Sequence, residues 1–170
     1  MKAMPSIRGR WEGIAAGVFL AGLGTVLALP SLRDAWRDDP YSNGGFPAFL
    51  IWLASLGIAS FLMRHRGGQG GTSWIVISAL LCAAGSITSL RVCHHLSLAA
   101  ALCGLAVQAR YGWLPAVAAL SWLPASGWLV SRFSEGGTSG WERPSASAAA
   151  AIVLLILCHL SKSFPDEKEP

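Results

Sequence analysis

The residues with the most chemical potential in this sequence are Arg91, Cys93, His94 and His95, which stand almost side by side. A thiol, an imidazole and a guanidinium are what a cysteine-type protease or transpeptidase uses as nucleophile, base and oxyanion partner. On a helix, however, adjacent side chains point about 100° apart, so Cys93 and His94 face each other only if the chain turns between them. The pattern therefore favours a non-catalytic protein and leaves a membrane enzyme that uses Cys93 as an alternative.

The two adjacent histidines also offer an axial ligand to a haem or a pigment, because ionisable residues inside membrane segments are often functional. A bis-histidine haem needs a second histidine at similar depth. We expect His65 in a cytoplasmic loop and His159 at the opposite membrane face. The simpler interpretation of His94 and His95 is that they are polar residues closing a tight hairpin. No cofactor is predicted, and the four cysteines lack the Cys-x-x-Cys spacing of a metal site.

Three acidic residues, Asp34, Asp38 and Asp39, precede a Pro-Tyr-Ser-Asn-Gly-Gly sequence at residues 40–45. Clustered carboxylates can bind a cation or dock a basic partner. The simpler interpretation is a solvated loop in which Pro40 and the glycines form the turn.

The composition excludes an ordinary soluble domain. Only 13% of the 170 residues are charged, against about 25% in soluble domains, and the mean hydropathy is +0.49. The formal charge of +4 comes from basic residues scattered singly or in pairs, without the basic stripe that a phosphate backbone requires. We therefore predict an all-α, polytopic membrane protein whose partners are lipids and other transmembrane proteins or helices, with no nucleic acid.

About 20 apolar residues cross a bilayer as a helix, and the sequence predicts about six such spans. They are residues 14–30, 46–63, 74–90, 92–108, 111–130 and 146–160. Gly17 and Ala21, four residues apart, are expected to let the first helix approach its neighbours closely. Pro115 and Pro124 each remove a backbone hydrogen bond, so we expect the fifth span to be broken.

The basic residues predict the orientation. Residues 1–13 are expected to be a cytoplasmic tail, 14–161 a single transmembrane domain and 162–170 a charged cytoplasmic tail of a multi-pass inner-membrane protein. The cytoplasmic side then carries more Lys and Arg than the outside. The cytoplasmic set is Lys2, Arg8, Arg10, Arg64, Arg66, Arg110, Lys162 and Lys168, and the outside set is Arg33, Arg37, Arg91, Arg132 and Arg143.

Two segments resemble the exosortase/archaeosortase family. The sequence Tyr41-Ser42-Asn43-Gly44, followed by an apolar span, is similar to the family's Tyr-Ser-His-Gly segment, and the stretch from Pro115 to Pro124 is similar to its proline-bounded helix. The resemblance covers residues 36–130. It implies a polytopic membrane protein that recognises a C-terminal sorting signal, namely a short motif, a transmembrane helix and a basic tail. In that family a cysteine, an arginine and a histidine cleave the signal.

The sequence departs from the family in its catalytic half. Asn43 stands where the family has histidine, and the only cysteine after Pro124 is Cys158, which lacks the family's following Ser and Gly. We therefore expect a degenerate or accessory exosortase-like protein that holds a partner's transmembrane helix or sorting helix in a groove beside the broken span. The alternative is a small structural subunit of a larger membrane complex, in contact with a haem or pigment.

Overall fold

The computed structural model describes residues 7–63, 71–106, 113–127 and 140–163. Over these residues the fold is all-α, as the sequence predicts, and contains no strand. The α-helices are α1 (Ile7–Asp38), α2 (Gly45–Met63), α3 (Gly71–Thr88), α4 (Arg91–Ala106), α5 (Trp113–Ala118) and α7 (Glu142–Ser163). Two short 3-10 helices, η2 (Ala119–Ser121) and η3 (Pro124–Ser126), lie between α5 and α7.

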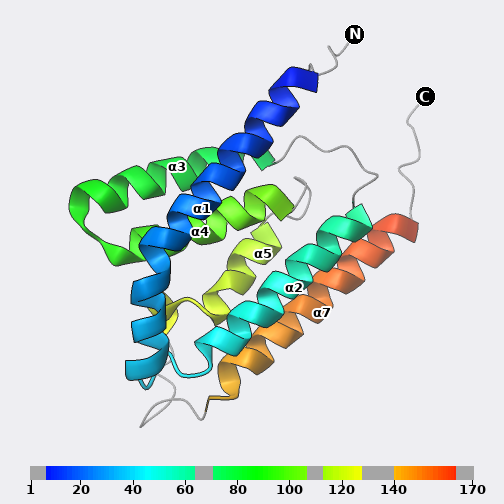
Figure 1. The fold of residues 1–170 in the computed structure, drawn as a ribbon. Coiled ribbons are helices and arrows are strands. Elements are labelled where there is room, and N and C mark those ends of the chain that lie inside the picture. The colour runs from blue at the N-terminus through cyan, green and yellow to red at the C-terminus, as the bar shows by residue number, and fades with distance from the viewer. Residues whose placement is uncertain (1–6, 64–70, 107–112, 128–139, 164–170) are drawn as a thin grey trace.

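The helices form two groups joined by a short one (Figure 1). The long helices α2 and α7 lie side by side, and α3 and α4 form a pair that α1 crosses and packs against. The short helix α5 lies between α4 and α2 and contacts both, as well as α7. The start of α1 and the ends of α2 and α7 lie toward the same end of the molecule (Figure 1).

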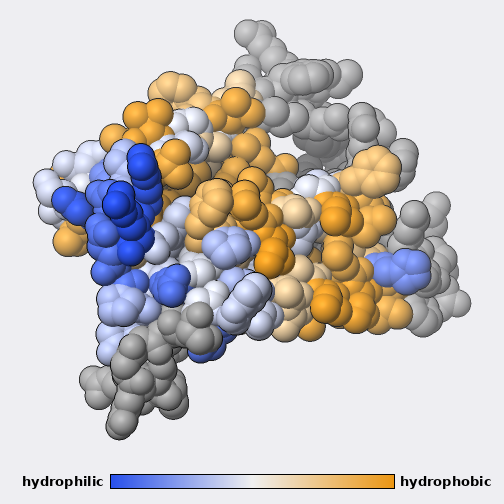
Figure 2. All heavy atoms as spheres, turned by 60° about the horizontal axis from the view of Figure 1, so that its bottom comes forward, coloured by the Kyte–Doolittle hydropathy of each residue, from blue (hydrophilic) through white to orange (hydrophobic). Residues whose placement is uncertain are grey.

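Three described helices are long and apolar enough to cross a membrane: Ala15–Asp38, Gly45–Leu62 and Glu142–Leu160. The apolar stretch of α3, Ser73–Thr88, is shorter. These helices turn large hydrophobic side chains outward, and Figure 2 shows such residues over much of one face, with hydrophilic residues gathered on one side. The outward set includes Phe19, Val26, Phe61, Leu80, Ile87, Ile152 and Ile156. This exterior is that of a membrane protein.

The first helix is longer than predicted. It begins at Ile7 and continues through Pro30 to Asp38, so the polar loop expected from Trp36 onward is reduced to residues 39–44. Leu32 is buried in the core and Trp36 packs against it four residues later, one helical turn on. This packing holds the extension in place. Figure 1 shows that α1 changes direction part-way along, and Pro30, the proline inside it, is the expected cause.

The predicted tight hairpin is confirmed. Only Ser89 and Leu90 separate α3 from α4, and Ser89 adopts the left-handed conformation (φ 57°) that the reversal requires. Inside the pair, Ser78 Oγ donates to the Ser97 carbonyl and Ser97 Oγ donates to the Ser78 carbonyl, both at 2.8 Å. Both side chains are fully buried. These reciprocal bonds satisfy two hydroxyls in an apolar interior and fix the register of the two helices.

The predicted break in the fifth span is also confirmed. α5 lasts six residues, and η2, the extended Leu123 and η3 follow it. The last predicted span is longer than expected, because α7 begins at Glu142 and ends at Ser163. The predicted ends at residues 108, 111 and 130 lie outside the described residues.

Glycines on α1 allow close helix packing, as the small-residue spacing predicts. A Cβ added at Gly17 would lie 2.7 Å from Leu105 Cδ2, and one at Gly24 would lie 3.3 Å from the Cα of Leu98. Gly17 and Gly24 are two helical turns apart on the face that contacts α4. In lipid, where helices gain little by hiding apolar surface, such close approach supplies the packing energy.

Four aromatic rings fill the core where α1, α2 and the broken segment meet. Trp122 is fully buried, with its centroid 4.9 Å from that of Phe49, 5.3 Å from that of Trp52 and 6.4 Å from that of Trp36. Trp36 Nε1 donates to the Trp122 carbonyl at 3.0 Å. The break therefore lies inside the protein, where neighbouring elements satisfy its backbone groups.

We predict that Gly45→Ala destabilises the fold by about 1–3 kcal/mol, the usual cost of overpacking. Gly45 is buried at the start of α2, and a Cβ there would collide with the Trp36 indole and displace its bond to Trp122. Thermal unfolding in detergent, followed by circular dichroism, measures the effect. Gly57→Ala is the matched control, because its Cβ meets nothing within 4 Å. Equal melting temperatures for the two variants would contradict this packing.

Candidate functional site

The first family-like segment forms a compact turn around Asp39. The Asp39 carboxylate accepts the backbone N–H of Tyr41 at 3.0 Å through Oδ1 and the Ser42 hydroxyl at 2.6 Å through Oδ2. Ser42 is fully buried. Gly44 has φ +78°, and a Cβ there would collide with the Gly140 carbonyl, so the position requires glycine. The turn is therefore ordered by its own side chains.

Asp34, Asp38 and Asp39, which could have formed a cation site, therefore lie in different surroundings. Asp39 turns inward as the acceptor of this turn. Asp34 and Asp38 are exposed on the last turn and a half of α1, where Asp38 lies 3.9 Å from the exposed Arg37. A surface pair of this kind adds little stability. The described positions do not bring the three carboxylates together as cation ligands.

The second family-like segment supplies backbone carbonyls as acceptors. Pro115 is buried, and its carbonyl accepts Trp52 Nε1 at 2.9 Å. Further on, the change from η2 to η3 around Trp122 and Leu123 interrupts the helical ladder. The Leu123 carbonyl accepts the backbone N–H of Ser126 at 3.2 Å and its hydroxyl at 2.7 Å. The Ser121 carbonyl needs a donor from elsewhere in the protein, because a buried carbonyl without a donor is costly.

Arg143, in the first turn of α7, joins the two segments. Its Nε donates to the Tyr41 carbonyl at 2.9 Å, and its Nη1 donates to the carbonyls of Ser121 and Leu123, both at 3.1 Å. The side chain is only 3% exposed. The planar guanidinium carries several N–H donors in a fixed geometry, so it can bind three carbonyl acceptors on two separate backbone segments. Segments about 80 positions apart therefore meet at one side chain.

One donor of this guanidinium is left over. Arg143 Nη2 is buried and has no hydrogen-bond partner, and the carboxylate that interacts electrostatically with the guanidinium is that of Asp39. A Cβ added at Gly127 would lie 3.7 Å from Nη2, 3.6 Å from Asp39 Oδ2 and 3.5 Å from Tyr41 Cβ. The missing side chain at Gly127 therefore leaves room for a single atom between a donor and an acceptor. A water molecule fits that chemistry, because it can accept from Nη2 and donate to Oδ2.

The sequence analysis placed Arg143 in an outside loop and missed its role. A signal was present. Glu142 and Pro144 are typical of the first helical turn, so Arg143 falls at a helix N-terminus. The helix dipole disfavours a cation there. A cation at that position indicates specific acceptors elsewhere in the fold.

The cluster of Arg91, Cys93, His94 and His95 does not assemble as a catalytic group. His95 is buried and its Nε2 lies 2.7 Å from Ser31 Oγ on α1. His94 points instead toward α3, where a Cβ added at Gly85 would lie 3.0 Å from Nδ1. Nδ1 is buried without a partner. No hydrogen bond within the described part of the chain joins Cys93 to either imidazole, so the arrangement supports helix packing better than thiol activation.

The remaining histidines and cysteines add no ligand set. His159 is exposed on α7, and His65 lies outside the described residues. Cys82, Cys103 and Cys158 are buried, Cys93 is half-buried, and all four are free thiols. Within the ranges that the structure covers, no three His, Cys, Asp or Glu side chains group as metal ligands.

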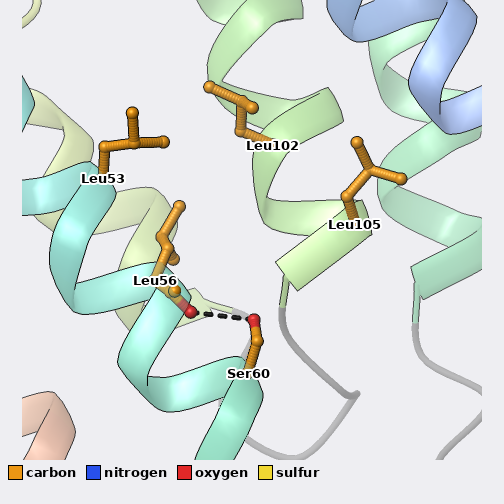
Figure 3. Close-up of a pocket in the computed structure, with 6 residues that line it drawn as sticks. Leu53, Leu56, Ser60, Leu102 and Leu105 are labelled. Atoms are coloured by element: carbon orange, nitrogen blue, oxygen red, sulfur yellow. Dashed lines mark hydrogen bonds between the residues drawn. The ribbon is translucent and has the colours of Figure 1, made fainter.

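An apolar groove lies between the second half of α2 and the end of α4, next to α5 (Figures 1 and 3). Its volume is about 390 Å³. Figure 3 shows leucines from both helices turned toward the space between them, with Ser60 at its lower edge donating to the Leu56 carbonyl at 2.8 Å. The lining residues are Leu53, Leu56, Gly57, Ser60, Leu102 and Leu105. α5, the first part of the broken segment, contacts both α2 and α4.

No protein-family model matches the chain, and neither the curated proteins nor the solved structures contain a match to it.

We predict that Arg143→Lys lowers the free energy of unfolding by about 2–4 kcal/mol, because lysine cannot reach three carbonyls with a planar fork and leaves buried acceptors unpaired. Arg37→Lys makes the same chemical change at an exposed site and is expected to have no measurable effect. Urea unfolding in detergent, followed by tryptophan fluorescence, compares the two. Equal stability of the variants would show that the Arg143 contacts do not hold the segments together.

Proposed function

We propose that this chain is an exosortase-like inner-membrane protein, non-catalytic or accessory, that holds a transmembrane helix or C-terminal sorting helix of a partner in the groove between α2 and α4. The observation that carries the proposal is the groove itself. It is apolar, open toward the surrounding membrane and bordered by leucines of two helices, with the small residues Gly57 and Ser60 along its α2 side. Small residues of this kind let a second helix approach closely.

The convergence of the two family-like segments supports the same proposal. Tyr41 belongs to one segment, Ser121 and Leu123 to the other, and Arg143 binds all three. A shared structural role explains why both segments occur in one chain. The lack of a hydrogen bond between Cys93 and either neighbouring histidine supports the non-catalytic form of the proposal.

The proposed topology has six crossings with the N-terminus in the cytoplasm. The three long apolar helices supply three of them. The α3–α4 hairpin and the broken segment after it supply the others, as shorter elements. Lys and Arg are more numerous on the proposed cytoplasmic side.

A second candidate function is that of a structural subunit in a larger membrane complex. The observation in its favour is the extent of large apolar side chains turned outward from α1, α2 and α7, which other subunits would cover. In that case a haem or pigment contact through His94 Nδ1 would require α3 to move, because this unpartnered nitrogen is buried near Gly85 of α3.

Site-specific photocrosslinking in the native host tests the leading proposal. A photoreactive residue in place of Leu105, at the groove and 38% exposed, is expected to capture a membrane protein with a C-terminal transmembrane helix. The same residue in place of Leu80, exposed on α3 away from the groove, is the control. Equal capture at both positions, or none at Leu105, would contradict the proposed groove occupant.

Thiol labelling tests the proposed orientation. Cys93 lies in the first turn of α4 and is half-buried, whereas the other three cysteines are buried. We expect a membrane-impermeant maleimide added to intact cells to label the wild type and not Cys93→Ser, because the α3–α4 turn faces outward in the N-terminus-inside topology. Labelling that requires permeabilised cells would reverse the orientation.

A further inference from the structure

Three buried polar atoms of the described residues have no hydrogen-bond partner, namely His94 Nδ1, Trp122 Nε1 and Arg143 Nη2. A Cβ added at Gly85 would lie only 3.0 Å from His94 Nδ1, so a water molecule does not fit between this nitrogen and the α3 backbone. The Trp122 ring is packed among other aromatic rings, which offer a water molecule few polar partners. Of these three atoms, Arg143 Nη2 is the one with both room and a polar neighbour beside it.

Gly127 provides the room. It is buried, and its backbone is helical (φ −57°, ψ −37°), a conformation that other residues adopt without strain. A Cβ added there would lie 3.7 Å from Arg143 Nη2, 3.6 Å from Asp39 Oδ2 and 3.5 Å from Tyr41 Cβ, which are ordinary van der Waals distances. Neither the backbone nor the packing of the described residues therefore requires glycine at this position. A small molecule bound beside it would explain the glycine.

The two polar groups beside Gly127 decide what kind of molecule can bind. Arg143 Nη2 is a donor that has no acceptor. Asp39 Oδ2 accepts the Ser42 hydroxyl at 2.6 Å, and a carboxylate oxygen can accept a second donor. An anion would be repelled by Asp39 and a carbonyl oxygen has no proton to donate, whereas a hydroxyl group accepts from one side and donates to the other. Water is the smallest molecule with this chemistry.

The charge of Arg143 makes such a contact favourable. The side chain is 3% exposed, and the three acceptors that it binds are neutral carbonyls. A buried cation is costly unless it is fully hydrogen-bonded and its charge is compensated. Asp39 is the carboxylate that interacts electrostatically with it. A bridging hydroxyl group would connect the remaining guanidinium donor to this carboxylate.

We propose that a single water molecule binds beside Gly127, where it accepts a hydrogen bond from Arg143 Nη2 and donates one to Asp39 Oδ2. The water completes the contacts of the guanidinium and joins the start of α7 to the turn before α2. These elements begin at the same end of the molecule (Figure 1). The water site goes beyond the proposed function and does not depend on a partner helix.

Gly127→Ala and Gly127→Ser, made in the full-length chain, test the proposal. The alanine methyl takes the place of the water and forms neither hydrogen bond, so we expect the melting temperature in detergent to fall by about 3–8 °C. The serine hydroxyl can form both bonds, so the melting temperature of that variant is expected to stay close to that of the wild type. Without a bound water, alanine at a helical position raises the melting temperature, because it restricts the unfolded chain. An alanine variant at least as stable as the wild type, or a serine variant no more stable than the alanine variant, would overturn the proposal.

The same two substitutions at Gly22 are the matched control. A Cβ at Gly22 on α1 meets nothing within 4 Å, and alanine is the better helix former, so Gly22→Ala is expected to be at least as stable as Gly22→Ser. The opposite order at Gly127 then reports the two hydrogen bonds. If circular dichroism shows that neither Gly127 variant folds, the position tolerates no side chain and the proposal is wrong.

A crystal structure of the full-length chain, at a resolution that reveals ordered water, provides a direct measurement. We expect a one-atom density peak at about 2.7–3.2 Å from both Arg143 Nη2 and Asp39 Oδ2. A protein acceptor bound directly to Nη2, with no such peak, would contradict the water site. Density that extends beyond one atom would show a larger hydroxyl-bearing ligand in its place and would also overturn the proposal. Neither result affects the crosslinking test at Leu105, because this measurement involves no partner.

Discussion

The structure depends on the contact between Arg143 and three backbone carbonyls. The break between η2 and η3 interrupts the helical hydrogen bonds around Ser121, and a membrane interior offers no water to replace them. Arg143 supplies the missing donors and also binds Tyr41, so the start of α7 closes over the turn before α2. One turn further along α7, the buried Ser147 Oγ donates to the Ala48 carbonyl at 2.8 Å, and this bond joins α7 to α2 directly.

The rest of the fold follows from the apolar membrane interior that surrounds the protein. In lipid, the burial of apolar side chains in the core gains little free energy. The core is therefore stabilised by close packing of the helices and by hydrogen bonds between buried polar groups. Gly17 and Gly24 bring α1 against α4, and Ser78 and Ser97 satisfy each other between α3 and α4. Along the groove at Gly57, α2 and α4 do not pack closely against each other. The partner helix of the proposed function would supply the missing contacts there.

Much of the fold could be predicted from the sequence, because apolar length, helix-breaking prolines and small residues act locally. The α3–α4 hairpin and the break between Pro115 and Pro124 are examples. The extension of α1 past Pro30 could not, because Leu32 and Trp36 hold it by packing on residues distant in sequence. Arg143 was missed for the same reason, since its acceptors belong to two segments that are distant from it in the sequence. His94 and His95 were predicted to close a hairpin, and only the structure shows that they face different helices.

In the proposed function the chain holds a partner's transmembrane helix and is not a fixed part of a larger assembly. The most direct measurement is purification of the tagged protein at its native expression level in a gentle detergent, with mass spectrometry and an absorption spectrum of what accompanies it. We predict that the protein is recovered alone or with proteins that carry a C-terminal transmembrane helix and a basic tail, and that the sample shows no visible chromophore. A constant set of large membrane subunits, with or without a coloured cofactor, would contradict it.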